Sequence, residues 1–229
     1  MVGDPDTLGF INGHLCLDNP GYQYLTQAGL QPAGRFRASE LAQREFAFLR
    51  HHLQANDLLV LAERLSEQYQ GVSIARMKTD RQLRREPVLI GSHDGQRAVV
   101  PDGWVDVRIG TVQHCVAFEL DGGTERRKKI KRKVQDLLDY SQGPYQSAFG
   151  TQSLTIAFVV AQGGSGRADE LLRWIEAVLE ERGRRQDADL FRVACFDPAC
   201  IEPEQAFFGA MWRRPFSLSL VPLIGGVNA

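Results

Sequence analysis

Cysteine is scarce in this chain, which has four cysteines among 229 residues, at positions 16, 115, 195 and 200. Cys195 and Cys200 lie five residues apart, but no second cysteine pair and no histidine accompanies them at the spacing of a zinc site. We therefore expect no structural zinc. The four cysteines are predicted to be buried free thiols in a reducing cytosol.

Long hydrophobic runs are also missing. The longest apolar stretch, residues 154–161, is too short to cross a bilayer and includes the polar Thr155. The first six residues, MVGDPD, are acidic and contain no apolar core of the kind that a secretory signal needs. These absences predict a cytoplasmic protein that has no membrane partner.

A large net charge is the third absence. The formal net charge of −1 argues against a protein that coats nucleic acid indiscriminately. The charges are unevenly distributed, however. Residues 124–150 carry seven basic and three acidic side chains, whereas residues 168–210 carry five basic and ten acidic ones. A local basic patch on a nearly neutral chain is suited to one docking face for a polyanion.

Turn residues and apolar periodicity divide the chain into two parts. Residues 1–36 are predicted to be an irregular N-terminal appendage with a hairpin, whose turn contains Asn19, Pro20 and Gly21. Residues 37–229 are predicted to form one α/β domain with a mixed central β-sheet flanked by helices. The expected helices are 39–70 (with Ser39 as N-cap and Gly71 at its end), 124–140 and 168–183. The expected strands are 72–77, 87–91, 105–109, 115–121, 154–161 and 190–196.

Two of these strands alternate between apolar and polar residues, which predicts a hairpin. If residues 110–113 form its turn, Trp104 lies opposite Glu119 and Asp102 lies opposite Asp121. In this register the apolar side chains share one face and the acidic side chains share the other. A slip of one residue would instead set valines against carboxylates.

Three carboxylates on one face repel one another unless a cation or a proton intervenes. Mg²⁺ is commonly held by one or two carboxylates, with water and substrate phosphate completing its coordination. We predict that Mg²⁺ or Mn²⁺ is bound by Asp102, Glu119 and the main-chain carbonyl of Leu120. The metal would activate water and neutralise charge on a scissile phosphate. The alternative is an ordinary solvated hairpin face.

The segment 126–133, RRKKIKRK, contains seven basic residues among eight. Most such runs are simply solvated, but this one directly follows the acidic strand. Lys133 borders the apolar stripe of its predicted helix, so it can reach the carboxylates and stabilise charge on a phosphate in the transition state. The other cations of the run are predicted phosphate contacts: Arg126, Arg127, Lys128, Lys129 and Arg132.

A glycine-rich segment, GGSGR at residues 163–167, follows a strand and opens a helix, which is a setting where phosphates bind. It has neither the ending of a P-loop nor the spacing of a dinucleotide-binding fingerprint. A tight turn between strand and helix is sufficient to explain these glycines. Arg167 is nevertheless a candidate for one further phosphate contact.

Several of these motifs, taken in order, are similar to one known family. The sequence VPDG, then FELDGGT, then a helix carrying a lysine resembles the replication-relaxation family of the PD-(D/E)xK restriction-endonuclease-like group. Further matching features are H-x-L-x-x-N-D from His51 to Asp57, the strand FVVAQGGSGR that ends at Arg167, and Trp212. The resemblance covers roughly residues 22–220.

The resemblance implies a PD-(D/E)xK nuclease-like core at residues 37–229, with Asp102 and Glu119 as its metal-binding acidic residues. It also implies that residues 1–36 are the remnant of a winged-helix wing. The lysine of the E-x-K motif is replaced by Asp121. Lys133, or as a second choice Lys129, would then replace it in catalysis, while Asp121 would be a third metal ligand or would hold Lys133.

Members of that family are associated with the replication and mobilisation of plasmids or integrative elements, and some are similar to conjugative relaxases. We therefore expect a metal-dependent protein that nicks or cleaves DNA, working with other replication or mobilisation proteins. A non-catalytic DNA-binding accessory protein on the same fold is the first alternative. The second is a protein-interaction module whose basic helix docks an acidic partner.

Overall fold

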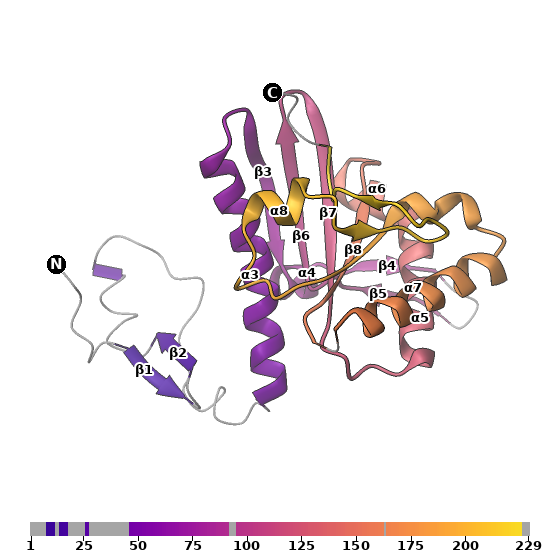
Figure 1. Cartoon of the computed structure of the whole chain (residues 1–229), viewed down its shortest axis with the longest axis horizontal. Coiled ribbons are helices and arrows are strands. Elements are labelled where there is room, and N and C mark those ends of the chain that lie inside the picture. The colour runs from indigo at the N-terminus through magenta and orange to yellow at the C-terminus, as the bar shows by residue number, and fades with distance from the viewer. Residues whose placement is uncertain are drawn as a thin grey trace. The chain divides into compact units, whose positions relative to one another are not determined.

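The computed structural model describes residues 8–11, 14–17, 26–27, 46–91, 95–162 and 164–225 (Figure 1). The chain divides into two compact units, Met1–His51 and His52–Ala229. In the first unit, strands β1 (Leu8–Ile11) and β2 (His14–Leu17) form an antiparallel pair. The predicted turn at residues 19–21 and the predicted helix start at Ser39 lie outside the described residues.

A mixed sheet forms the centre of the second unit, as the sequence predicts, and it has seven strands. Its strands lie in the order β11-β10-β9-β8-β7-β6-β3. Strands β7, β8 and β9 run parallel, and the other neighbouring pairs are antiparallel. Strands β4 (Val88–Ile90) and β5 (Arg97–Val99) form a separate antiparallel pair. The strands of the large sheet are β3 (Val72–Thr79), β6 (Gly103–Ile109), β7 (Val112–Asp121), β8 (Thr155–Val160), β9 (Phe191–Cys195), β10 (Trp212–Arg213) and β11 (Leu220–Val221).

Helices cover both faces of the large sheet (Figure 1). One core cluster lies beneath α5, α6 and α7, and the other lies beneath α8 and residues 58–65 of α3. In the described ranges, no helix is both long and apolar enough to span a membrane. The helices are α3 (Phe46–Gln68), α4 (Asp80–Arg85), α5 (Arg127–Ser141), α6 (Pro144–Phe149), α7 (Gly164–Glu181), α8 (Pro203–Phe208) and the 3-10 helix η2 (Arg185–Leu190).

Both faces of β7 are buried, which determines the surroundings of its acidic side chains. Val116 and Phe118 point into the cluster beneath α3 and α8, whereas Ala117 points into the cluster beneath α5 and α7. Because side chains alternate along a strand, Glu119 and Asp121 share the face of Ala117. Both are buried, so these two carboxylates do not belong to a solvated hairpin face.

The register of the β6–β7 hairpin differs from the predicted register by two residues. The predicted four-residue turn is wrong, because only Gly110 and Thr111 connect the strands. Trp104 consequently lies opposite Ala117 and not opposite Glu119. Gly110 has a φ of 56°, a conformation that glycine adopts without strain and that tight hairpin turns require.

A shift of two residues changes the partners across the hairpin but keeps each side chain on its predicted face. The amide of Asp102 donates to the carbonyl of Phe118 at 2.9 Å. This bond places Asp102 next to Glu119, so the predicted position of Asp102 opposite Asp121 is wrong. In the observed register, the two predicted metal-binding carboxylates lie closer together along the hairpin than in the predicted register.

The predicted helices and strands lie within a few residues of their expected positions, whereas several short elements are not predicted at all. Helix α5 begins at Arg127, three residues after the predicted start, and its N-cap residue Arg126 makes no side-chain capping hydrogen bond. Helix α7 begins at Gly164, so Arg167 lies in its first turn. No sequence pattern indicates α4, α6, α8 or strands β5, β10 and β11, because such short segments contain too few residues to show a period.

The prediction of buried cysteines is right for Cys115 and wrong for two others. Cys115 is a buried free thiol on β7, but Cys195 and Cys200 are free and exposed. Cys195 is the last residue of β9, and Cys200 follows in the connection to α8. Both therefore lie where the chain leaves the buried part of the sheet.

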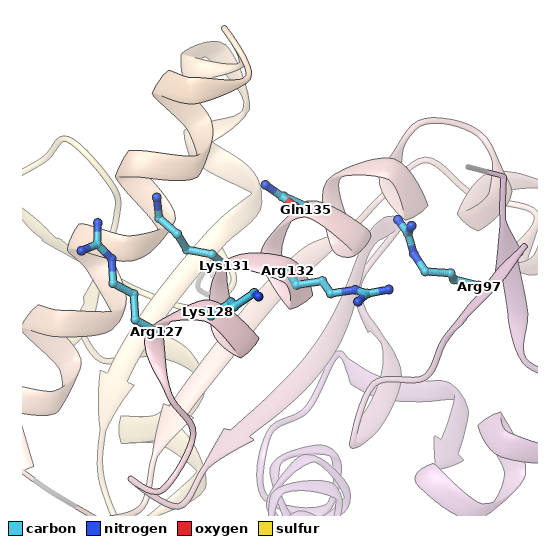
Figure 2. Close-up of a pocket in the computed structure, with 6 residues that line it drawn as sticks. All are labelled: Arg97, Arg127, Lys128, Lys131, Arg132 and Gln135. Atoms are coloured by element: carbon cyan, nitrogen blue, oxygen red, sulfur yellow. The ribbon is translucent and has the colours of Figure 1, made fainter. Parts of the chain in front are cut away.

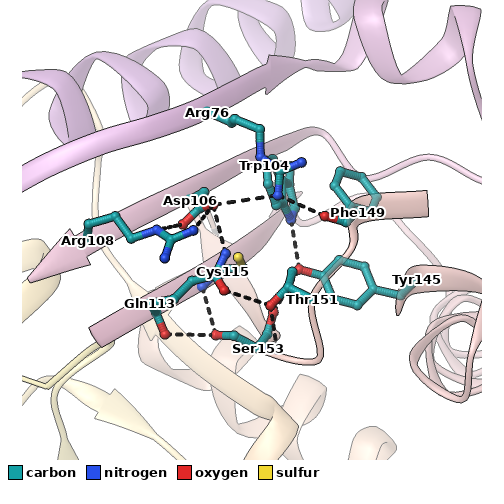
Figure 3. A network of polar contacts seen from close by, with 10 residues as sticks. All are labelled: Arg76, Trp104, Asp106, Arg108, Gln113, Cys115, Tyr145, Phe149, Thr151 and Ser153. Carbon is teal, nitrogen blue, oxygen red and sulfur yellow. Dashed lines mark hydrogen bonds and ion pairs between the residues drawn. The ribbon is translucent and has the colours of Figure 1, made fainter. Parts of the chain in front are cut away.

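A buried carboxylate on β6, Asp106, joins neighbouring parts of the sheet (Figure 3). Asp106 is fully buried and accepts a hydrogen bond from Nε2 of Gln113 at 2.8 Å. Nε of Arg108 lies 2.9 Å from Asp106, and Nη2 of Arg76 on β3 lies 3.6 Å away. Gln113 also accepts a hydrogen bond from the hydroxyl of Thr151 at 2.8 Å. This network connects β3, β6 and β7 with the segment that precedes β8.

Replacing Asp106 with Ala should lower the free energy of unfolding by about 2–3 kcal/mol, because it removes a buried charged acceptor and leaves Nε2 of Gln113 without the carboxylate that it binds. Urea denaturation measures this loss. Glu86→Ala, which removes an exposed carboxylate paired with Lys78, serves as the control and should cost less than about 1 kcal/mol. Equal losses in the two variants would contradict the role of the network.

Candidate active site

Glu119 and Lys133 form an ion pair between strand β7 and helix α5. Nζ of Lys133 lies 2.8 Å from Oε2 of Glu119. The Glu119 side chain is 3% exposed, and the Lys133 side chain is 28% exposed. Lys133 reaches the strand because Ile130 and Val134, on the same side of α5, are buried against the sheet. This ion pair thus joins two of the four residues predicted to act in catalysis.

Asp102 lies beside this ion pair, immediately before β6. Oδ2 of Asp102 accepts a hydrogen bond from the amide of Leu120 at 2.8 Å. The amide and carbonyl of one strand residue point to the same side of the strand, so the carbonyl of Leu120 points to the side of β7 on which Asp102 lies. The three groups predicted to bind a metal therefore lie at one end of the β6–β7 pair: Asp102, Glu119 and the carbonyl of Leu120.

Burial and neighbouring charges shift the pKa values of the ion pair. Burial, opposed by the positive charge of Lys133 and reinforced by the negative charge of Asp102, raises the pKa of Glu119 to about 7. Burial alone would lower the pKa of Lys133, but the negative charges of Glu119, Asp102 and Glu125 raise it above its ordinary value. Lys133 therefore stays positively charged at neutral pH, and Glu119 keeps its proton to a higher pH than an exposed glutamate does.

Asp121 makes contacts different from those that the sequence predicts. Its carboxylate accepts hydrogen bonds from Nε of Arg167 at 2.6 Å and from Nη2 at 3.2 Å. The acidic partners of Lys133 are Glu119, at 2.8 Å, and Glu125, at 3.7 Å. Asp121 thus holds Arg167 and does not hold Lys133. Arg167, a predicted phosphate contact, is 9% exposed and lies against Asp121 in the interior.

A basic hollow of about 720 Å³ lies beside α5 (Figure 2). In Figure 2, Arg132 of α5 and Arg97 of β5 extend towards the same space. No sequence motif marks Arg97, because it reaches this surface only through the packing of β5 against α5. The residues that line the basic hollow are Arg97, Arg127, Lys128, Lys131, Arg132 and Gln135.

A smaller hollow of about 240 Å³ opens beside the Glu119–Lys133 pair. Arg132 lines both hollows, so the basic hollow and the ion pair are neighbours. Arg126, the residue before α5, is not among the lining residues of either hollow. The smaller hollow is lined by Ala98, Val99, Val100, Glu119, Lys129, Arg132, Lys133, Asp136 and Leu137.

The predicted phosphate contacts differ in their availability. Within the described ranges, Arg127, Lys128 and Arg132 have no acidic side chain within ion-pair distance. Lys129, by contrast, lies 2.5 Å from Glu125. Three cations on the exposed side of α5 are therefore available to bind an anion.

The candidate site offers few side-chain ligands for a metal ion. Among the residues that the structure describes, no group of three or more His, Cys, Asp or Glu side chains is placed to hold a metal ion. A metal at the candidate site would therefore have two carboxylates, those of Asp102 and Glu119. Its remaining ligands would be main-chain, water and substrate oxygen atoms.

No family model, curated protein or solved structure matches this chain. The resemblance to the replication-relaxation family therefore stays a prediction. One of its features, Trp212, is fully buried and donates a hydrogen bond to the carbonyl of Ala206 at 2.7 Å. This contact assigns Trp212 to the packing of the core.

The raised pKa of Glu119 predicts how stability depends on pH. Because its pKa rises from 4.5 to about 7 on folding, the folded protein binds more protons than the unfolded chain between these values. The free energy of unfolding should therefore fall as the pH rises through this window. Thermal unfolding of the wild type and Glu119→Gln at pH 4.5–8 tests this, since the glutamine variant should lose less stability. Parallel curves would contradict the prediction.

Proposed function

We propose that this protein binds DNA and, with a divalent metal, nicks or cleaves a phosphodiester bond during replication or mobilisation of a plasmid or another mobile element. One observation carries the catalytic part of the proposal. The 2.8 Å contact between Lys133 and Glu119 puts a cation beside two carboxylates, next to a basic hollow. The replication or mobilisation setting rests on the family resemblance alone.

The donor set is suited to Mg²⁺ or Mn²⁺. Asp102, Glu119 and the carbonyl of Leu120 offer only oxygen atoms, and Mg²⁺ is commonly bound by one or two carboxylates plus water and substrate phosphate. Because burial raises the pKa of Glu119, metal binding would also compete with the protonation of this carboxyl group. The bound metal would supply activation of water and neutralisation of phosphate charge.

Lys133 supplies the positive charge that the family motif places on the strand. In the motif that charge follows the glutamate by two residues, where this chain has Asp121. The ammonium group of Lys133 instead approaches Glu119 from α5 and remains partly exposed. From there it can contact a phosphate oxygen and stabilise the charge that develops there in the transition state.

The basic hollow is suited to the phosphate backbone of DNA. Arg127 and Lys128 lie in the first turn of α5, which contains no acidic residue. Cations at a helix N-terminus are opposed by the helix dipole, and a bound anion would relieve this repulsion. The side chains that line the basic hollow include no aromatic residue for stacking on bases. We therefore expect contacts that depend on the backbone and not on the DNA sequence.

A non-catalytic DNA-binding protein is the second candidate, and the ion pair itself favours it. Lys133 already occupies one carboxylate oxygen of Glu119, so a metal must compete with this lysine. DNA binding by the cations of the basic hollow would not require a metal to displace Lys133. In this case the protein would bind DNA without cutting it under any metal.

Nicking of supercoiled plasmid in Mg²⁺ or Mn²⁺ separates the two candidates. Glu119→Gln and Lys133→Met should each lower the nicking rate by about 100-fold or more, because each removes a group that acts in the transition state. Lys78→Met is the matched control, since it removes a lysine that pairs with the exposed Glu86 and lines neither hollow, and it should retain most activity. Equal rates for the wild type and Glu119→Gln would refute the catalytic proposal.

DNA binding is tested by removing two charges from the basic hollow. The double variant Arg127→Gln/Lys128→Gln should weaken binding and lower the salt slope of log K by about 2, roughly 0.9 for each lost phosphate contact. Arg81→Gln/Arg85→Gln removes the same charge from exposed positions of α4 and should leave the slope unchanged. Fluorescence anisotropy over a range of salt concentrations measures the affinity and the salt slope of both double variants. No binding of wild type at physiological salt would favour an acidic protein partner instead.

A further inference from the structure

Asp121 and Arg167 form a buried, two-point ion pair at the end of β7. Two nitrogen atoms of the Arg167 guanidinium bind the two carboxylate oxygens, at 2.6 and 3.2 Å. The amide of Gly123 also donates to Asp121, at 3.2 Å. The side chains are 2% and 9% exposed, so solvent screens this pair little.

The guanidinium of Arg167 also contacts the segment that leads into α5. Nη2 of Arg167 donates to the main-chain carbonyl of Glu125 at 2.7 Å. The Glu125 side chain lies 2.5 Å from Lys129 and 3.7 Å from Lys133. Arg167 therefore fixes the main chain of a residue whose carboxylate attracts the candidate catalytic lysine.

These contacts form a closed ring that begins and ends on β7. It passes from Asp121 to Arg167 on α7, then to Glu125 before α5, then to Lys133, and returns to the strand at Glu119. We propose that Asp121 and Arg167 are positioning residues for Lys133 and act through Glu125. The catalytic consequence rests on the proposed function, but the positioning itself does not.

This role explains why an aspartate is useful where the family motif has lysine. A lysine on the strand is placed by the strand itself, whereas Lys133 depends on where α5 begins and on a long, flexible side chain. Asp121 secures Arg167, and Arg167 in turn secures the segment that precedes α5. An error of about 1 Å in the position of a catalytic group can lower a rate about 100-fold.

The contacts of Arg167 also argue against its use as a phosphate ligand. Its nitrogen atoms bind Asp121, the carbonyl of Glu125 and, at 3.0 Å, the carboxylate of Glu170. Its guanidinium carbon lies 4.8 Å from the centre of the Trp174 ring. A phosphate could reach Arg167 only by displacing partners that already satisfy most of its donors.

Two readouts test the positioning role in Arg167→Lys, which keeps the charge but cannot bind the two carboxylate oxygens of Asp121 through separate nitrogen atoms. In metal-free, DNA-free protein, the ¹H–¹⁵N NMR signal of the Lys133 ammonium group should be observed in the wild type, because an ordered ion pair slows its proton exchange. That signal should broaden or disappear in Arg167→Lys. In the nicking assay, kcat should fall about tenfold or more, with KM for DNA nearly unchanged.

Arg182→Lys is the matched control. Nη1 of Arg182 lies 3.1 Å from Asp139 and also links the end of α7 to α5, but it does not contact the ring. This variant should keep the Lys133 signal and the wild-type kcat. Asp121→Asn, which keeps the shape of the side chain, replaces Arg167→Lys if that variant does not fold, and should give the same losses.

The outcomes separate the two proposals. A Lys133 signal that is unchanged in Arg167→Lys and Asp121→Asn, or that is already missing in the wild type, overturns the positioning role. If the wild type does not nick DNA but Arg167→Lys loses the Lys133 signal, the positioning role stands and the catalytic proposal fails. If all variants, including Arg182→Lys, lose the signal equally, the ring has no specific effect and the inference is overturned.

Discussion

Burial of β7 on both faces is the constraint on which the candidate site depends. Helices α5 and α7 cover the face that carries Glu119 and Asp121, so both carboxylates lose their contact with water. A buried charge is strongly unfavourable unless a partner compensates it. Each covering helix supplies one cation, Lys133 from α5 and Arg167 from α7. The two ion pairs therefore follow from one feature of the packing.

The two cations differ in kind, and this difference favours separate roles. Arg167 binds Asp121 through two nitrogen atoms, is almost fully buried and also holds the main chain of Glu125. A planar guanidinium with several fixed contacts is suited to supporting a structure. Lys133 makes one short contact with Glu119 and remains partly exposed. An ammonium group with one short contact can exchange that contact for a phosphate oxygen, as the proposed function would require.

Helix α5 connects the candidate chemistry with the candidate DNA surface. Its apolar side packs against the sheet, Lys133 lies at the border of that side, and its exposed side carries Arg127, Lys128 and Arg132. Arg132 lines both the basic hollow and the smaller hollow beside Glu119. DNA held on the exposed side would therefore be held next to the two carboxylates. The proposed DNA surface and the proposed catalytic site are therefore continuous.

The sequence by itself determined which residues share a face. Alternation along β7 placed Glu119 and Asp121 together, and apolar spacing along α5 placed Lys133 at the border of the packed side. Only the tertiary structure decided the hairpin register, because alternation with a period of two is unchanged by a shift of two residues. It also decided that the acidic face is buried, that Asp121 binds Arg167 and that Arg97 joins the basic hollow. These contacts join segments distant in the chain, so they depend on how helices and strands pack and not on any local pattern.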